Sequence, residues 1–147
     1  MKDLKPLIEA VVPELVELRQ ALHRIPELGY EEEETAKRLL TELRTIPGIE
    51  IRSGIAGTGI VATLGAEKEG PCVALRSDMD ALPIVEEMDI PYASNNPGRM
   101  HACGHDGHMA CLVGAVKVLS HLQDELTGPV KFIFQPAEET GAGGEKM

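Results

Sequence analysis

The sequence predicts an α/β fold in which helices cover a mostly parallel or mixed β-sheet. Segments with an apolar residue at every third or fourth position alternate with short, continuous apolar segments. Gly and Pro residues separate the two kinds of segment. The 147 residues, 43% of them hydrophobic, are enough for one domain with a buried core.

The first helix is predicted near the N-terminus and should end near Ile25-Pro26, because a residue before proline is disfavoured in a helix. Pro13 predicts a kink, or a division into two shorter helices. A second helix begins at the acidic run Glu31–Glu34 and continues through Leu43, since carboxylates in a first turn favour the positive end of the helix dipole. The apolar stripe of the first helix comprises Leu4, Leu7, Ile8, Val11, Val12, Leu15, Leu18 and Leu22.

Four strands are predicted: Ile49–Arg52, Thr58–Leu64, Cys72–Ser77 and Val130–Phe134. The continuous apolar run of Val130–Phe134 is typical of a central strand. Asp78–Arg99 is predicted to be a long loop, and such loops are usually functional or disordered. His105–Leu122 is apolar over most of its circumference, which predicts a well-buried helix. Cys111 on that helix and Cys72 on its strand are expected to be small core residues.

Composition excludes several classes of function. The formal net charge of −10 and the 3% aromatic content, with no Trp, argue against nucleic acid and against an anionic membrane surface as partners. The sequence contains neither the apolar core of a secretory signal nor an apolar run of about 20 residues. Three cysteines are too few for a disulfide framework, so reduced thiols in the cytoplasm are expected.

The most informative segment is Met100–His108. Cys103 and His105 lie two positions apart, so they would point to the same side of an extended segment. A thiolate and an imidazole so placed suit a zinc-like ion. Two alternatives remain open: a buried Cys beside a surface His, and a Cys–His nucleophile pair oriented by Asp106. The segment contains two more histidines, His101 and His108, which are not assigned as ligands.

Pairs of carboxylates follow two of the predicted strands. Of Glu138 and Glu139, one could bind a metal while its neighbour holds the attacking water; the alternative is two solvated loop acids. Asp78 or Asp80 could orient a ligand imidazole; the alternative is a loop salt bridge to Arg76. Because open α/β sheets bind ligands at the carboxyl ends of their strands, these clusters are expected on one rim.

At these motifs the chain resembles the metal-dependent aminoacylase/carboxypeptidase family, in particular its amidohydrolase branch, which includes hippurate hydrolases and auxin-conjugate hydrolases. The resemblance implies Cys103, His105 and Glu139 as ligands of a divalent metal ion, which would be zinc, manganese, nickel or cobalt. It also implies Glu138 as the general base and Asp80 as an acid that positions the site. The segments that carry the resemblance are Leu22–Gly29, Leu75–Ile84, Met100–His108 and Phe134–Glu139.

The resemblance further implies hydrolysis of the amide bond of a small-molecule substrate, an N-acyl amino acid, by a zinc-peptidase-like α/β domain. Relatives insert a smaller dimerisation domain, so the full-length form would be a homodimer, and they supply further metal-binding histidines downstream. Residues 1–147 are therefore expected to be the N-terminal part of the catalytic domain, weakly active or inactive by itself. The alternative is a non-catalytic metal-binding or interaction fragment.

Overall fold

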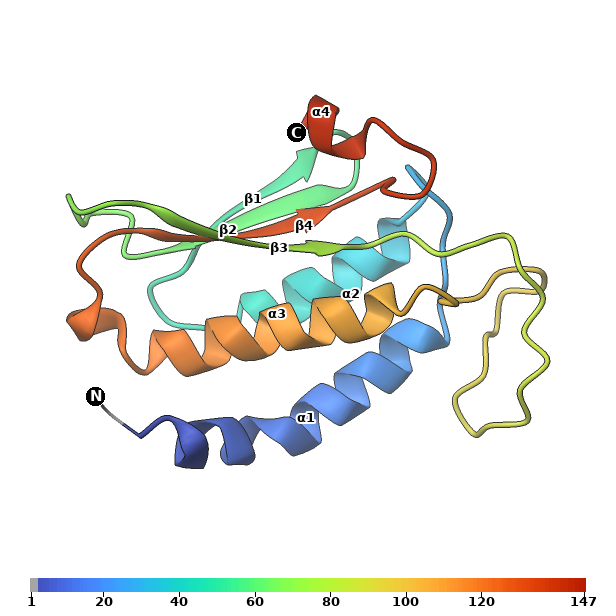
Figure 1. Cartoon of the computed structure of the whole chain (residues 1–147), viewed down its shortest axis with the longest axis horizontal. Coiled ribbons are helices and arrows are strands. Elements are labelled where there is room, and N and C mark those ends of the chain that lie inside the picture. The colour runs from blue at the N-terminus through green and yellow to red at the C-terminus, as the bar shows by residue number, and fades with distance from the viewer. Residues whose placement is uncertain (1–2) are drawn as a thin grey trace.

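A four-stranded mixed sheet with three long helices on one side confirms the α/β prediction (Figure 1). The computed structural model describes residues 3–147. The strand order is β1-β2-β4-β3, in which β4 pairs with β2 in antiparallel and with β3 in parallel orientation. The predicted strand Val130–Phe134 is thus an inner strand. The strands are β1 (Glu50–Ile55), β2 (Gly59–Leu64), β3 (Val73–Asp78) and β4 (Val130–Gln135).

The helices end where the sequence predicts. Helix α1 (Lys5–His23) stops just before Ile25-Pro26 and continues through Pro13 as one helix, whose axis bends along its length in Figure 1. Helix α2 (Glu33–Leu43) has two glutamates in its first turn, and α3 (His105–Ser120) is largely buried. A 3-10 turn (η1, Gln123–Glu125) and a four-residue helix (α4, Gly143–Lys146) were not predicted. None of the described helices is both long and apolar enough to cross a bilayer.

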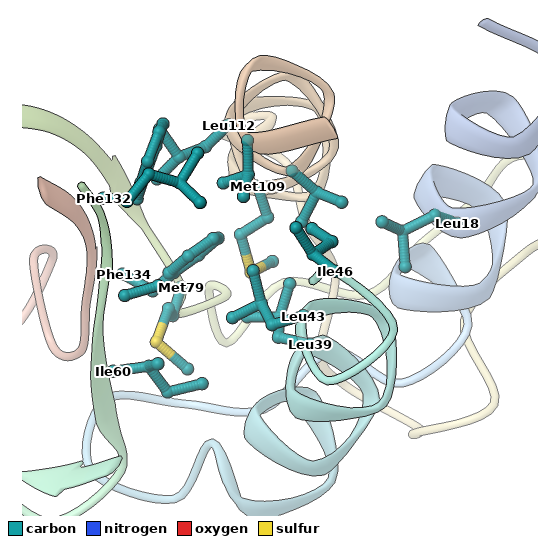
Figure 2. Close-up of a cluster of buried hydrophobic side chains, with 14 of the residues drawn as sticks. Leu18, Leu39, Leu43, Ile46, Ile60, Met79, Met109, Leu112, Phe132 and Phe134 are labelled. Atoms are coloured by element: carbon teal, nitrogen blue, oxygen red, sulfur yellow. The ribbon is translucent and has the colours of Figure 1, made fainter. Parts of the chain in front are cut away.

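The core lies between the sheet and the helices. Figure 2 shows Phe132 and Phe134 pointing from β4 toward Met109 of α3, with leucines of α2 on the other side. Both phenylalanines are fully buried, and each such side chain contributes about 2–3 kcal/mol to folding. Of the apolar stripe on α1, only Leu18 and Leu22 are buried in this core. The first half of that stripe is more exposed than its periodicity predicts.

The expectation that Cys72 and Cys111 are core residues is wrong, because both side chains are exposed. Cys72 precedes β3, an edge strand whose first four residues are exposed. Cys111 lies on an open flank of α3, where it lines hollows shared with Val12 and Leu15 of α1 and another shared with Leu75 of β3. Helical periodicity could not distinguish that side from the buried one, since α3 is apolar all round.

Two chain segments leave the same edge of the sheet. Asp78, the last residue of β3, is opposite Gln135, the last residue of the parallel strand β4. The long loop after β3 is held in place by backbone hydrogen bonds, including a mutual pair between Leu82 and Met100 at 3.0 Å. Both segments therefore come together with the N-terminal end of α3 (Figure 1).

Candidate metal centre

His105, the first residue of α3, has one ring nitrogen fixed and one available. Its Nδ1 lies 2.8 Å from the backbone carbonyl oxygen of Asp80. A carbonyl can only accept, so Nδ1 carries the proton and the neutral ring keeps its lone pair on Nε2. That Nε2 lies 3.7 Å from an oxygen of Asp78 and 3.8 Å from an oxygen of Glu139. The imidazole is therefore held in the tautomer that a metal ligand requires.

Cys103, His105 and Glu139 converge as the sequence predicts. One ligand atom from each residue lies within 4.8 Å of the other two. The expected extended segment is wrong, however: residues 101–104 form a turn in which the amide of Gly104 donates to the carbonyl of His101 at 3.2 Å. Gly104 has φ +83°, which a residue with a Cβ rarely adopts. The convergence thus depends on this turn and not on strand alternation.

Asp80 is almost fully buried and connects the two sides of the site. Its Oδ2 accepts a hydrogen bond of 2.9 Å from the amide of Glu139, and its Oδ1 lies 3.4 Å from Nδ1 of His105. Burial acts to raise the pKa of Asp80, but the hydrogen bonds from His105 and the Glu139 amide outweigh it, so the pKa is lowered. Asp80 thus stays ionised while holding the candidate ligands His105 and Glu139 on its two sides.

Ionisable neighbours shift the pKa values of both the imidazole and the thiol. Burial acts to lower the pKa of His105, but hydrogen bonding to Asp80 and the charge of Asp78 raise it overall. A hydrogen bond to the Glu139 carboxylate is the main cause that raises the pKa of the Cys103 thiol. Desolvation and the negative charge of Glu139 raise this pKa further. A divalent cation would reverse this effect, because it favours the thiolate and the neutral imidazole.

A second group of possible ligands is formed by Asp78, His105 and His108, again within 4.8 Å of one another. It shares His105 with the first group, and a single free Nε2 can bind only one cation. Arg76 also competes for Asp78 through an ion pair of 2.5 Å, and it donates to Gln135 at 2.9 and 3.0 Å. The alternative of a salt bridge to Arg76 is therefore present, and Asp78 is its partner. The set containing Cys103 is the better candidate for a metal site.

The nucleophile alternative is not supported, because Asp106 does not orient His105. Its Oδ2 instead lies 2.7 Å from Nδ1 of His23 and 2.7 Å from Nε of Arg19. These contacts of the buried Asp106 carboxylate link the first turn of α3 to α1. His101 is also buried, and neither of its ring nitrogens has a hydrogen-bond partner among residues 3–147. Burial lowers the pKa of His101 to about 4.

The position of the two glutamates depends on a residue that the sequence analysis did not single out. Glu32 is fully buried, and its Oε1 accepts a hydrogen bond of 2.8 Å from the amide of Ala137. The helix dipole accounts for the glutamates in the first turn of α2, but not for this one. No signal within the run of four glutamates distinguishes Glu32 from its neighbours, since its partner lies 105 residues away.

The donor set fits a divalent cation. Thiolate, imidazole and carboxylate together suit zinc or another late first-row metal. The thiol and the carboxylate of the set lie toward solvent while the imidazole is buried, which leaves a route for a cation. Glu138 follows the same strand end, and its side chain is exposed.

The chain is also similar to proteins of a known family. The model of the family described as Peptidase family M20/M25/M40 matches residues 74–147. The N-acetyl-L-cysteine deacetylase of Bacillus subtilis is 49% identical over 91% of the chain and 32% of its own length. The N-acyl-L-amino acid amidohydrolase of Geobacillus stearothermophilus is 43% identical over 97% of the chain and 38% of its own length.

A solved structure is similar as well. The Bacillus subtilis YXEP protein, described as a dinuclear metal binding peptidase from the M20 family, superposes with a TM-score of 0.88 at 43% identity. The match covers 94% of the chain and 39% of that protein. The chain spans about a third of the length of the curated relatives that it matches.

Proposed function

Because the chain belongs to peptidase family M20/M25/M40, we propose that it supplies part of the active site of a metal-dependent amidohydrolase acting on N-acyl amino acids. The observation that carries this proposal is the convergence of Cys103, His105 and Glu139 within 4.8 Å at one edge of the sheet. The names of two relatives, a deacetylase of N-acetyl-L-cysteine and an amidohydrolase of N-acyl-L-amino acids, support the substrate class.

Three side chains would hold the cation: the thiolate of Cys103, Nε2 of His105 and the carboxylate of Glu139. A bound divalent cation supplies Lewis-acid polarisation of a carbonyl oxygen and makes water more acidic. Asp80 acts as a positioning residue, since its carbonyl oxygen fixes the His105 ring and its carboxylate fixes the backbone of Glu139. The identity of the ion and the dimeric state of the full-length form stay predictions.

Glu138 is the proposed general base. Its carboxylate takes a proton from the attacking water and passes it to the nitrogen of the leaving amine, so that the products are a carboxylate and an amino acid. Two features support this role: the side chain is exposed, and it is adjacent in sequence to the proposed ligand Glu139. The exposed carboxylate can therefore reach a substrate bound at the same rim.

The test compares Glu138→Gln with the parent, both in the full-length form, in amine release from N-acetyl amino acids after loading with Zn²⁺, Mn²⁺, Ni²⁺ or Co²⁺. Loss of a general base should lower the turnover about 10²- to 10⁴-fold, while metal stoichiometry, measured by elemental analysis, stays unchanged. Glu50→Gln on the exposed strand β1 is the matched control and should retain parental turnover.

Near-parental turnover in Glu138→Gln would refute its role as a base. Metal binding by the full-length parent without any hydrolysis would favour the alternative, a non-catalytic metal-binding role. Failure of the parent to bind any of the four ions would refute the metal centre itself.

A further inference from the structure

The segment that carries Glu138 and Glu139 has an unfavourable backbone conformation at its start. Ala137 has φ +50°, in the left-handed region that residues with a Cβ rarely adopt. Ala137 is nonetheless fully buried and lies directly before the two glutamates. Contacts with the rest of the fold must therefore hold it in this conformation.

Glu32 provides one such contact. Its carboxylate is fully buried at the N-terminal end of α2, and each of its oxygens accepts one hydrogen bond. Oε1 accepts from the amide of Ala137 at 2.8 Å, and Oε2 accepts from the hydroxyl of Thr58 at 2.6 Å. A carboxylate accepting from a backbone amide forms a stronger bond than a neutral acceptor does. Glu32 thus connects α2, the start of β2 and the segment after β4.

The same stretch of chain contacts the segment at a second point. A Cβ added to Gly29 would lie 2.5 Å from Oγ1 of Thr140 and 3.0 Å from Cβ of Ala137. Gly29 therefore packs directly against the segment 137–140. Asp80 holds the amide of Glu139 from another direction, at 2.9 Å. The backbone on both sides of Glu138 is thus fixed by buried carboxylates, at residues 137 and 139.

We infer that Glu32 is a positioning residue for the metal centre, which it serves by holding Ala137 so that Glu139 faces Cys103 and His105. This inference rests on the proposed function, since it assigns Glu32 a role toward the same cation. The alternative is that Glu32 only stabilises the fold as a buried partner of Thr58. The two roles predict different behaviour of the metal, and matched variants separate them.

The experiment is a titration of the 147-residue chain with Co²⁺ alone, monitored by the absorption of the Cys103 thiolate–cobalt bond. Glu32→Ala should weaken Co²⁺ binding about 10- to 100-fold, the usual cost of losing a group that orients a ligand. Glu32→Gln should bind within about threefold of the parent. Its amide oxygen can accept from Ala137, and its amide nitrogen can donate to Thr58.

Thr58→Val is the matched control for stability. It removes the other hydrogen bond of Glu32 and so destabilises the fold, but it leaves the bond to Ala137 in place. Its Co²⁺ affinity should stay near that of the parent. Amide hydrogen exchange, measured by NMR, gives an independent readout: exchange at Ala137 should accelerate in Glu32→Ala and not in Glu32→Gln.

Parental Co²⁺ affinity in Glu32→Ala, or equal weakening by Thr58→Val, would overturn the inference. If Glu32→Ala does not fold, Glu32→Asp replaces it, because a carboxylate one methylene shorter cannot reach both partners; parental affinity there would also overturn the inference. If the parent does not bind Co²⁺, the proposed metal centre fails. The exchange rate at Ala137 then still decides whether Glu32 holds this segment.

Discussion

Replacing Asp80 with alanine tests the physical basis of the proposed site. Asp80 is almost fully buried, accepts from the Glu139 amide at 2.9 Å and lies 3.4 Å from Nδ1 of His105. Hydrogen bonds to a charged group contribute about 1.5–3 kcal/mol each, and the variant leaves the Glu139 amide without its acceptor. We therefore expect Asp80→Ala to lower the free energy of unfolding by about 3 kcal/mol.

Urea unfolding followed by far-ultraviolet circular dichroism measures this change, since the chain has no Trp to serve as a fluorescent probe. Asp80→Asn is the matched control. The amide oxygen of the substituted side chain can still accept from the Glu139 amide, so the free energy of unfolding of this variant should fall by only about 1 kcal/mol. A loss below about 1 kcal/mol in Asp80→Ala, or equal losses in the two variants, would refute the reasoning.

The stability contributed by Asp80 should also depend on pH in a defined direction. Its pKa in the folded chain is lowered from the ordinary value of 3.8. A carboxyl group of this kind stabilises the fold fully above its unfolded pKa, and this contribution is lost as the pH falls through the lower, folded pKa. The difference in stability between the parent and Asp80→Asn should therefore be constant near neutral pH and shrink below about pH 3.8. A stability difference between the two proteins that grows as the pH falls would contradict a lowered pKa for Asp80.

Two other substitutions test the surroundings of the site. Asp106→Ala leaves His23 and Arg19 without their shared buried carboxylate, so it should lower the free energy of unfolding by about 3 kcal/mol; a change below about 1 kcal/mol would show that this network contributes little. Glu139→Gln removes the carboxylate that raises the pKa of the Cys103 thiol, so alkylation of Cys103 should accelerate about two- to tenfold at pH 8 by mass spectrometry. An unchanged rate would place the thiol outside the influence of Glu139.

Local signals were enough to predict most of the elements. The apolar run Val130–Phe134 follows Gly128-Pro129, and together these features define β4 almost to the residue. Pro26 likewise predicts the end of α1. The order of the strands was not predictable, because the pairing of β4 with β2 and β3 joins segments far apart in the sequence. The prediction that the ligands share one rim needed only parallel strands and agrees with the observed pairing.

Residues that act through the backbone were the hardest to predict. The acceptor that fixes the His105 ring is the carbonyl oxygen of Asp80, and a carbonyl leaves no mark on the choice of side chain. Glu32 was overlooked because its partner is the amide of Ala137, which any residue except proline would supply. Side-chain chemistry therefore pointed to Cys103, His105 and a pair of glutamates, and the family resemblance assigned Glu139 among them. The groups that orient these residues appeared only in three dimensions.

The hydrogen bond between His105 and the Asp80 carbonyl has a consequence for how such a centre gains and loses its ion. Zinc fingers are unfolded without their metal, because the ion alone gathers the ligands. In this chain, protein contacts gather the ligands beforehand. A chelator should thus remove the metal without unfolding the domain, and adding the divalent metal ion again should restore the site.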